Sequence, residues 1–229
     1  MYIEKLIIKN YRNFKNFEIQ LKPFTLIIGE NNIGKTNFLN ALGLIFSQDI
    51  TFFKKRNLEI DDINYQTIEN FKRDIVNYKK PIDDIDIPTV EVVAELVDFS
   101  EEQESVVADW AINKELNRVR ITYLFYPKED LKEWILKERE RLVKEKDLSE
   151  NELIKFISFP INKYNYTISG GLNQTKQIDF YFLKMLKYEF LNAVRDVKNE
   201  LTANGNYRLL YRVLTNREEG KYQDILRVC

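Results

Sequence analysis

FTLIIGENNIGKTNFLNALGLIF, residues 24–46, is the stretch that decides the fold. It begins with an apolar run typical of a strand and passes through a loop bounded by glycines. It continues with apolar residues at i, i+3, i+4, i+7 and i+8, the spacing of one buried helix face. The loop satisfies G-x-x-x-x-G-K-[ST] between a strand and a helix, which is the context that a phosphate-binding loop requires. The residues of this loop are Gly29, Glu30, Asn31, Asn32, Ile33, Gly34, Lys35 and Thr36.

The residue types in this loop fit the binding of ATP with Mg²⁺. Gly29 and Gly34 permit backbone geometries that a side chain would block, so consecutive N–H groups can turn inward and form an anion-binding nest. The helix that opens at Lys35 adds the positive end of its dipole. Lys35 supplies a point charge for the β- and γ-phosphates, and Thr36 supplies a hydroxyl for Mg²⁺. The alternative is a plain strand, turn and helix with an accidental lysine.

Composition limits the other classes of site. The formal net charge of −1 over 229 residues excludes a generally basic nucleic-acid coat, so DNA contact would have to come from a local patch or a partner. Cys229 is the single cysteine and the chain has no histidine. Disulfides within the chain, His/Cys metal sites and histidine-based triads are therefore excluded.

Targeting and membrane signals are not found in the sequence. The chain begins directly with a strand pattern rather than a signal peptide, and no apolar run approaches the length of a membrane span. We therefore expect a cytoplasmic protein without membrane contact. No repeat, low-complexity tract or long linker divides the chain.

Alternating and helical patterns predict the elements around the loop. Residues 2–9 and 17–21 alternate as two antiparallel strands that lead into the strand at 24–28, with Arg12 at the tip of the intervening turn. Further helices are predicted over 65–78, 100–116 and 129–146, from Ser149 and over 206–214, further strands over 89–98, 119–125 and 188–194, and a hairpin over 164–178.

Two stretches admit a second interpretation. Lys54, Lys55 and Arg56 form a charge run that we interpret as a solvated loop, with a phosphate contact as the alternative. The tail of the strand at 89–98 resembles a Walker B strand ending in Asp98. However, glutamates interrupt its apolar run and Phe99 follows where a catalytic glutamate is needed, so an antiparallel strand is preferred.

Four strings of the sequence resemble a known family. IEKLIIKNYRNFKNFEIQL (residues 3–21) followed by TLIIGENNIGKTNFLNAL (residues 25–42) is similar to the amino-terminal half of ATP-binding heads in the RecF/SMC branch of ABC-type ATPases. YEFLNAVRDVKNEL (residues 188–201) and NYRLLYRVL (residues 206–214) narrow the resemblance to the overcoming-lysogenization-defect (OLD) family, which includes the Gabija-type anti-phage nucleases.

The resemblance implies a fold class and roles for named residues. The fold would be α/β: a P-loop NTPase of the ABC-type head, with residues 1–229 as its incomplete amino-terminal lobe and a mixed sheet containing antiparallel strands. Residues 29–36 would hold the triphosphate and Mg²⁺, and Arg12 would lie near the nucleotide. Arg195 and Asp196 would form a Q-loop-like segment that senses the γ-phosphate or its metal, unless they are a plain ion pair at a helix start.

The sequence also departs from that family. A complete head needs a serine-glycine signature motif, a Walker B aspartate with a following glutamate, a D-loop and usually a switch histidine, and the family's Toprim nuclease domain lies further on. None of these is found, so we expect a truncated product, an engineered fragment or one part of a split head. A homodimer or a complementing chain would supply the signature motif and Walker B, and DNA would be met through the complete protein.

The expected function follows from these observations. The chain would bind ATP and Mg²⁺ weakly as the ATPase module of a DNA-processing or phage-defence protein, without turnover alone. One alternative is a non-catalytic module that uses nucleotide to fold or to hold a partner. Another P-loop enzyme is a further alternative, but a GTPase lacks support because neither N-K-x-D nor D-x-x-G is present, and a nucleotide kinase because no lid arginine cluster follows the loop.

Overall fold

One antiparallel sheet organises the computed structural model, which describes residues 1–47, 55–113, 115, 117–145, 148–173 and 177–186. The strand order is β2-β1-β3-β4-β5, and every pair of neighbours is antiparallel. A mixed sheet was the expectation, but no parallel pair occurs among the described strands. The strands are β1 (Tyr2–Tyr11), β2 (Phe14–Gln20), β3 (Val90–Val97), β4 (Arg118–Pro127) and β5 (Tyr164–Gly170).

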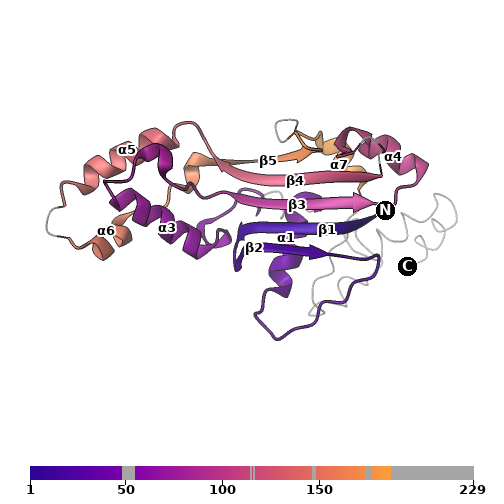
Figure 1. The fold of residues 1–229 in the computed structure, drawn as a ribbon, viewed down its shortest axis with the longest axis horizontal. Coiled ribbons are helices and arrows are strands. Elements are labelled where there is room, and N and C mark those ends of the chain that lie inside the picture. The colour runs from indigo at the N-terminus through magenta and orange to yellow at the C-terminus, as the bar shows by residue number, and fades with distance from the viewer. Residues whose placement is uncertain (48–54, 114, 116, 146–147, 174–176, 187–229) are drawn as a thin grey trace, which may run out of the picture. The chain divides into compact units, whose positions relative to one another are not determined.

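The core lies on one face of this sheet. Leu6 and Ile8 of β1 are fully buried on it, as the alternation in the sequence predicts, and the alternate residues of β3 and β4 continue the same face. Helix α1 (Lys35–Phe46) packs against β3 and β4. In Figure 1, α1 lies behind the strands. The helix that carries the phosphate-binding loop is therefore anchored on the central strands.

The opposite face of the sheet carries interlocked charges. Glu95 of β3, whose side chain is only 4% exposed, accepts from Arg120 Nη2 at 2.6 Å and from Arg118 Nη1 at 3.4 Å. Arg118 also pairs with Glu4 of β1. The predicted antiparallel β3 is confirmed, and Glu95 is compatible with its central position because two arginines compensate the buried charge.

The place of Asp98 in the fold bears on the Walker B interpretation. Lys9 faces Glu91 and Tyr2 faces Val97, so β3 runs away from the end of β1 that leads to the β1–β2 turn. Asp98 therefore follows β3 at the end of the sheet opposite Arg12. The preference for an antiparallel strand over a Walker B strand is confirmed.

The remaining helices gather at the two ends of the sheet. Figure 1 shows α3, α5 and α6 beyond one end and α4 and α7 at the other, and α3 packs against α5 and α6. Their bounds are α3 (Tyr65–Val76), α4 (Glu101–Val107), α5 (Leu131–Leu142), α6 (Glu150–Phe156) and α7 (Phe180–Met185), with 3₁₀ turns at Ile60–Asp62, Ile82–Asp84, Ala108–Trp110 and Ile161–Lys163.

Two helix starts confirm the capping boxes read from the sequence. Ser100 caps α4 with Gln103 as its reciprocal partner, and Ser149 caps α6 with Glu152. The hydrogen bond from Ser149 lowers the pKa of the Glu152 carboxyl. The predicted end of α4 is wrong, because this helix stops at Val107 and a 3₁₀ turn follows.

The strand predicted immediately before the phosphate-binding loop is not formed. Residues 24–28 belong to no strand, and Phe24, Leu26 and Ile28 are 86%, 70% and 83% exposed. A strand needs a neighbour to take its backbone hydrogen bonds, and none of the five described strands lies beside this segment. The apolar pattern therefore marks side chains that are suited to burial, but none of the described strands pairs with this segment and buries them.

The predictions for the C-terminal part of the chain are not tested by the structure. The predicted strand at 188–194, the pair Arg195 and Asp196 and the helical pattern at 206–214 lie outside the described residues. Within the described part, none of the helices combines the length and the apolar character needed to cross a membrane.

Candidate functional site

The phosphate-binding loop enters α1 with the backbone geometry that its motif predicts. Gly34 has φ +110° and Asn32 has φ +70°, both in the left-handed region, and α1 begins at Lys35. A Cβ at Gly34 would lie 2.4 Å from Asn13 Nδ2, and the positive φ favours glycine at this position. The N-cap residue offers no side-chain hydrogen bond and the first turn of α1 holds no acidic residue. The N-terminus of α1 is thus suited to an external anion.

Lys35 and Thr36 carry the polar groups expected of the loop. Lys35 Nζ lies 2.5 Å from the carbonyl oxygens of both Gly29 and Glu30, so its ammonium group folds back over the loop. Thr36 follows in the first turn of α1 and is exposed to solvent.

The residues present fit a magnesium ion that is held mainly by phosphates. Mg²⁺ usually takes one or two protein ligands and completes its shell with substrate phosphates and water. The Thr36 hydroxyl is a suitable oxygen ligand next to the loop. In the described part of the chain, no group of three or more acidic, histidine or cysteine side chains could hold a metal without a nucleotide.

Arg12 lies between the segment before α3 and the first turn of α1. Its Nε and Nη2 bind Asp62 Oδ1, each at 2.9 Å, and its Nη1 donates to Asn37 Oδ1 at 2.8 Å. Arg12 has φ +49°, and its backbone N–H donates to the carbonyl oxygen of Asp62. The turn thus brings Arg12 to the helix that follows the phosphate-binding loop, although the two are distant in sequence.

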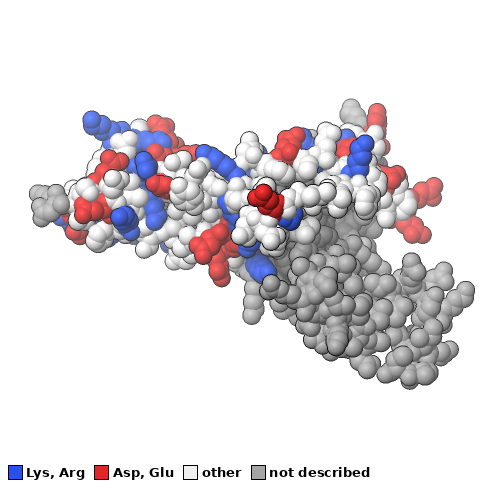
Figure 2. Space-filling view, turned by 90° about the horizontal axis from the view of Figure 1, so that it is seen from below, with Lys and Arg blue, Asp and Glu red and all other residues white. Residues whose placement is uncertain are grey.

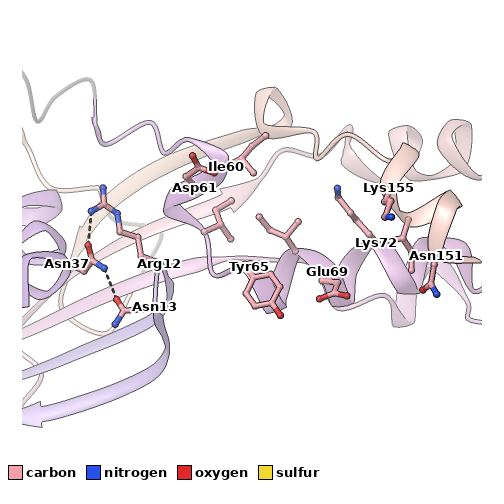
Figure 3. A pocket seen from close by; sticks show the side chains of 13 residues that line it. Arg12, Asn13, Asn37, Ile60, Asp61, Tyr65, Glu69, Lys72, Asn151 and Lys155 are labelled. Atoms are coloured by element: carbon pink, nitrogen blue, oxygen red, sulfur yellow. Dashed lines mark hydrogen bonds between the residues drawn. The ribbon is translucent and has the colours of Figure 1, made fainter. Parts of the chain in front are cut away.

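Two asparagines that the sequence analysis missed connect Arg12 with the loop. Asn37 Nδ2 donates to Asn13 Oδ1 at 2.7 Å, and Asn13 Nδ2 donates to the carbonyl oxygen of Ile33 at 3.2 Å. Figure 3 shows Arg12, Asn37 and Asn13 in this order along one side of the pocket. Their places directly after Arg12 and after the motif were the available signal, but neither position has a pattern of its own.

A large pocket begins at these three side chains. Its volume is about 980 Å³, and it extends from the β1–β2 turn to α3 and α6, as Figure 3 shows. Isoleucines supply apolar surface, and burial lowers the pKa of Lys72 at the far end. The lining residues are Arg12, Asn13, Asn37, Ile60, Asp61, Ile63, Tyr65, Ile68, Glu69, Lys72, Asn151, Ile154 and Lys155.

The basic run at 54–56 behaves differently from its prediction. Arg56 is 2% exposed and donates to the carbonyl oxygens of Leu44, Ile45 and Ser47, at 2.8, 3.0 and 3.0 Å. It therefore caps the C-terminus of α1, and burial lowers its pKa. For Arg56, both the solvated-loop prediction and the phosphate-contact alternative are wrong, because its side chain is buried against these carbonyl oxygens. Lys55 is exposed, and Lys54 lies outside the described residues. A cation shortly after a predicted helix end was the signal for this cap.

Comparison with curated proteins finds relatives in DNA processing. The chain is 24% identical over 217 residues to "DNA replication and repair protein RecF" of Rickettsia akari, covering 84% of this chain and 59% of that protein. It is 47% identical over 47 residues to RecF of Rickettsia canadensis, covering 20% and 13%. "Endonuclease GajA" of Bacillus cereus matches with 35% identity over 85 residues, covering 36% and 15%. The matched part of the chain thus spans between 13% and 59% of the length of these relatives.

A solved structure and a family model complete the comparison. The structure, titled "Structural biochemistry of ATP-driven dimerization and DNA stimulated activation of SMC ATPases", is 14% identical with a TM-score of 0.40, covering 100% of this chain and 98% of the other. The family model described as "AAA ATPase domain" matches residues 1–224. The described part of the chain is an α/β fold in which the phosphate-binding-loop motif leads into α1, and the chain belongs to the AAA ATPase domain family.

Proposed function

We propose that this chain binds ATP with Mg²⁺ through residues 29–36, as the nucleotide-binding part of an ATPase head in a DNA-processing or phage-defence protein similar to the OLD family. The observation that carries the proposal is the geometry of the loop. Left-handed Gly34 leads into a helix N-terminus without an acidic residue, and Lys35 lies over the loop. In this role Lys35 binds the β- and γ-phosphates and Thr36 ligates Mg²⁺.

The pocket beside the loop supports the binding of the nucleoside as well. Asn37 and Arg12 line the pocket and also lie at the first turn of α1, where the phosphates end. Beyond them, the 44% exposed Ile60 and the 69% exposed Tyr65 offer apolar and aromatic surface for a base. These contacts support the proposal that Arg12 lies near the nucleotide, between its phosphates and its nucleoside.

Completion by further structure is the second part of the proposal. The exposed apolar side chains of 24–28 require a neighbouring strand, which a homodimer, a complementing chain or further sequence would supply together with the signature motif and Walker B. Arg195 and Asp196 are proposed as the Q-loop-like segment. Figure 2 shows acidic and basic side chains intermixed over the described part of the face that it draws, without a large basic patch. We therefore propose that DNA contact is made through the complete protein.

The test is a titration of the purified chain with MgATP, with thermal stability followed in the same samples. We expect binding that raises the melting temperature, and about 100-fold weaker binding for Lys35→Ala, because the ammonium contacts charged phosphates. Lys15→Ala, which removes an exposed lysine of β2, is the matched control and should bind like wild type. GTP should compete less well than ATP.

Two outcomes contradict the proposal. Equal affinity of wild type and Lys35→Ala would mean that the loop does not hold the phosphates. Steady ATP hydrolysis by the chain alone, abolished by Lys35→Ala, would contradict the need for a completing partner.

A non-catalytic interaction module is the second candidate function. The exposed apolar surface at 24–28 favours it, because such a surface can hold a partner without any chemistry. Partner binding that survives in Lys35→Ala would support this candidate, whereas partner binding that requires ATP and Lys35 would support the ATPase head.

A further inference from the structure

The amide of Asn13 lies directly against the last peptide of the phosphate-binding loop. Its Nδ2 donates to the carbonyl oxygen of Ile33, and the same nitrogen occupies the space that a Cβ on Gly34 would need. The Nδ2 atom of Asn13 therefore lies against the backbone of both Ile33 and Gly34. The motif itself does not include this residue.

Peptide geometry gives this contact a consequence for the loop. The chain has no cis peptide among its described residues, so the carbonyl oxygen of Ile33 and the N–H of Gly34 point in opposite directions across one plane. A partner that holds the carbonyl on one side therefore fixes the direction of the N–H on the other side. In an anion-binding nest, the direction of each N–H decides whether it reaches the phosphate.

We propose that Asn13 is a positioning residue of the phosphate-binding loop, which holds the Ile33 carbonyl toward the β1–β2 turn and thereby turns the Gly34 N–H toward the phosphates. This role rests on the proposed function. It also deepens it, because a residue outside the motif fixes the loop before the nucleotide arrives.

The hydrogen bonds that reach Asn13 all run in one direction. Arg12 donates to the oxygen of Asn37, the nitrogen of Asn37 donates to the oxygen of Asn13, and the nitrogen of Asn13 donates to Ile33. In such a chain each bond polarises the next. Asp62 fixes its origin by pairing with Arg12. Arg12 thus acts on the loop through two amides, in addition to lying near the nucleotide.

The test uses a probe without a nucleoside. Wild type, Asn13→Ala and the control Asn16→Ala, which changes an exposed asparagine of the same hairpin, are titrated with MgATP and with magnesium tripolyphosphate. We expect Asn13→Ala to bind both about tenfold more weakly, an effect comparable with the loss of one hydrogen bond to a charged group. Because Asn13 is exposed, its melting temperature should stay within about 2 °C of wild type.

A double-mutant cycle tests the chain of amides. Asn37→Ala removes the group that orients Asn13, so the double variant should lose no more affinity than Asn13→Ala alone. Fully additive losses would overturn the relay. If Asn13→Ala does not fold, Asn37→Ala decides the matter by the same two probes.

The remaining outcomes separate this role from the proposed function. MgATP and tripolyphosphate binding by Asn13→Ala at wild-type affinity would overturn the positioning role and leave the proposed function standing. Weakened binding of ATP but unchanged binding of tripolyphosphate would also overturn it, because Asn13 would then act on the nucleoside. Failure of wild type to bind either ligand would overturn both proposals.

Discussion

The two flanks of the phosphate-binding loop are built in different ways. On the downstream flank, the β1–β2 turn, α1 and the segment before α3 are joined by hydrogen bonds from Arg12, Asn13 and Asn37. On the upstream flank, residues 24–28 expose apolar side chains and pair with none of the described strands. The difference teaches that the end of the loop that leads into α1 is held by the β1–β2 turn, whereas residues 24–28 are held by none of the described strands.

The largest contrast between the flanks is expected from two leucines. Leu6→Ala should lower the free energy of unfolding by about 3 kcal/mol, because Leu6 is fully buried in the sheet and its loss leaves a cavity. Leu26→Ala should change it by less than about 0.5 kcal/mol, because Leu26 is 70% exposed. Urea unfolding of both variants measures the contrast, and equal losses would show that residues 24–28 are packed in solution.

The cap at the far end of α1 should give the next largest effect. Arg56→Met keeps much of the buried side-chain volume but leaves the carbonyl oxygens of Leu44, Ile45 and Ser47 without their donor. We expect a loss of about 2 kcal/mol in the free energy of unfolding. Urea unfolding beside the exposed control Lys15→Ala measures it, and a stability unchanged from wild type would mean that other groups satisfy these carbonyls.

Alkaline pH should lower the stability of the protein through Tyr11, the last residue of β1. Burial raises the pKa of Tyr11 to about 12 from the ordinary value of 10.0. The unfolded chain releases this proton first, so stability is complete below pH 10 and is lost as the pH rises from 10 through 12. At pH 11 the loss attributable to Tyr11 is on the order of 1 kcal/mol. Tyr11→Phe should show a shallower decline in melting temperature over this range, and an identical decline would contradict the assignment.

The smallest effect is expected at the partly buried ion pair between Arg12 and Asp62. Asp62→Asn removes the charge partner of Arg12 and should cost about 1 kcal/mol or less of stability. MgATP affinity should change more clearly than stability, because Arg12 orients the amides beside the loop. Parallel titration and thermal melting would distinguish this from a purely structural pair, for which only the melting temperature moves.

Local patterns predicted the elements well where their determinants are near in sequence. The capping boxes at Ser100 and Ser149, the helix beginning at Lys35 and the alternation of β1 all depend on residues within one or two turns of each other. The entry of the phosphate-binding loop into α1 belongs to this class, since the left-handed Gly34 directly precedes the helix.

The missed features depend on long-range partners. In the sequence, Arg56 is part of an ordinary charge run. Only the fold brings three carbonyl oxygens at the end of α1 within hydrogen-bond distance of it. Residues 24–28 have a strand pattern, but a pattern does not provide a neighbouring strand. Asn13 and Asn37 are ordinary polar residues in sequence, and only the fold aligns their amides.

Glu95 has a consequence for how the strands find their partners. A slip of β3 by one residue would move its entire apolar set to the wrong face. A slip of two residues that placed Glu95 opposite Thr122 would keep the faces, but it would move Glu95 away from Arg118 and Arg120 and leave a buried carboxylate without a counter-charge. Because Arg118 also binds Glu4, the same cluster couples three strands. The cluster therefore disfavours a slip of β3 toward Thr122 while the chain folds, in addition to the one-residue slips that the apolar pattern excludes.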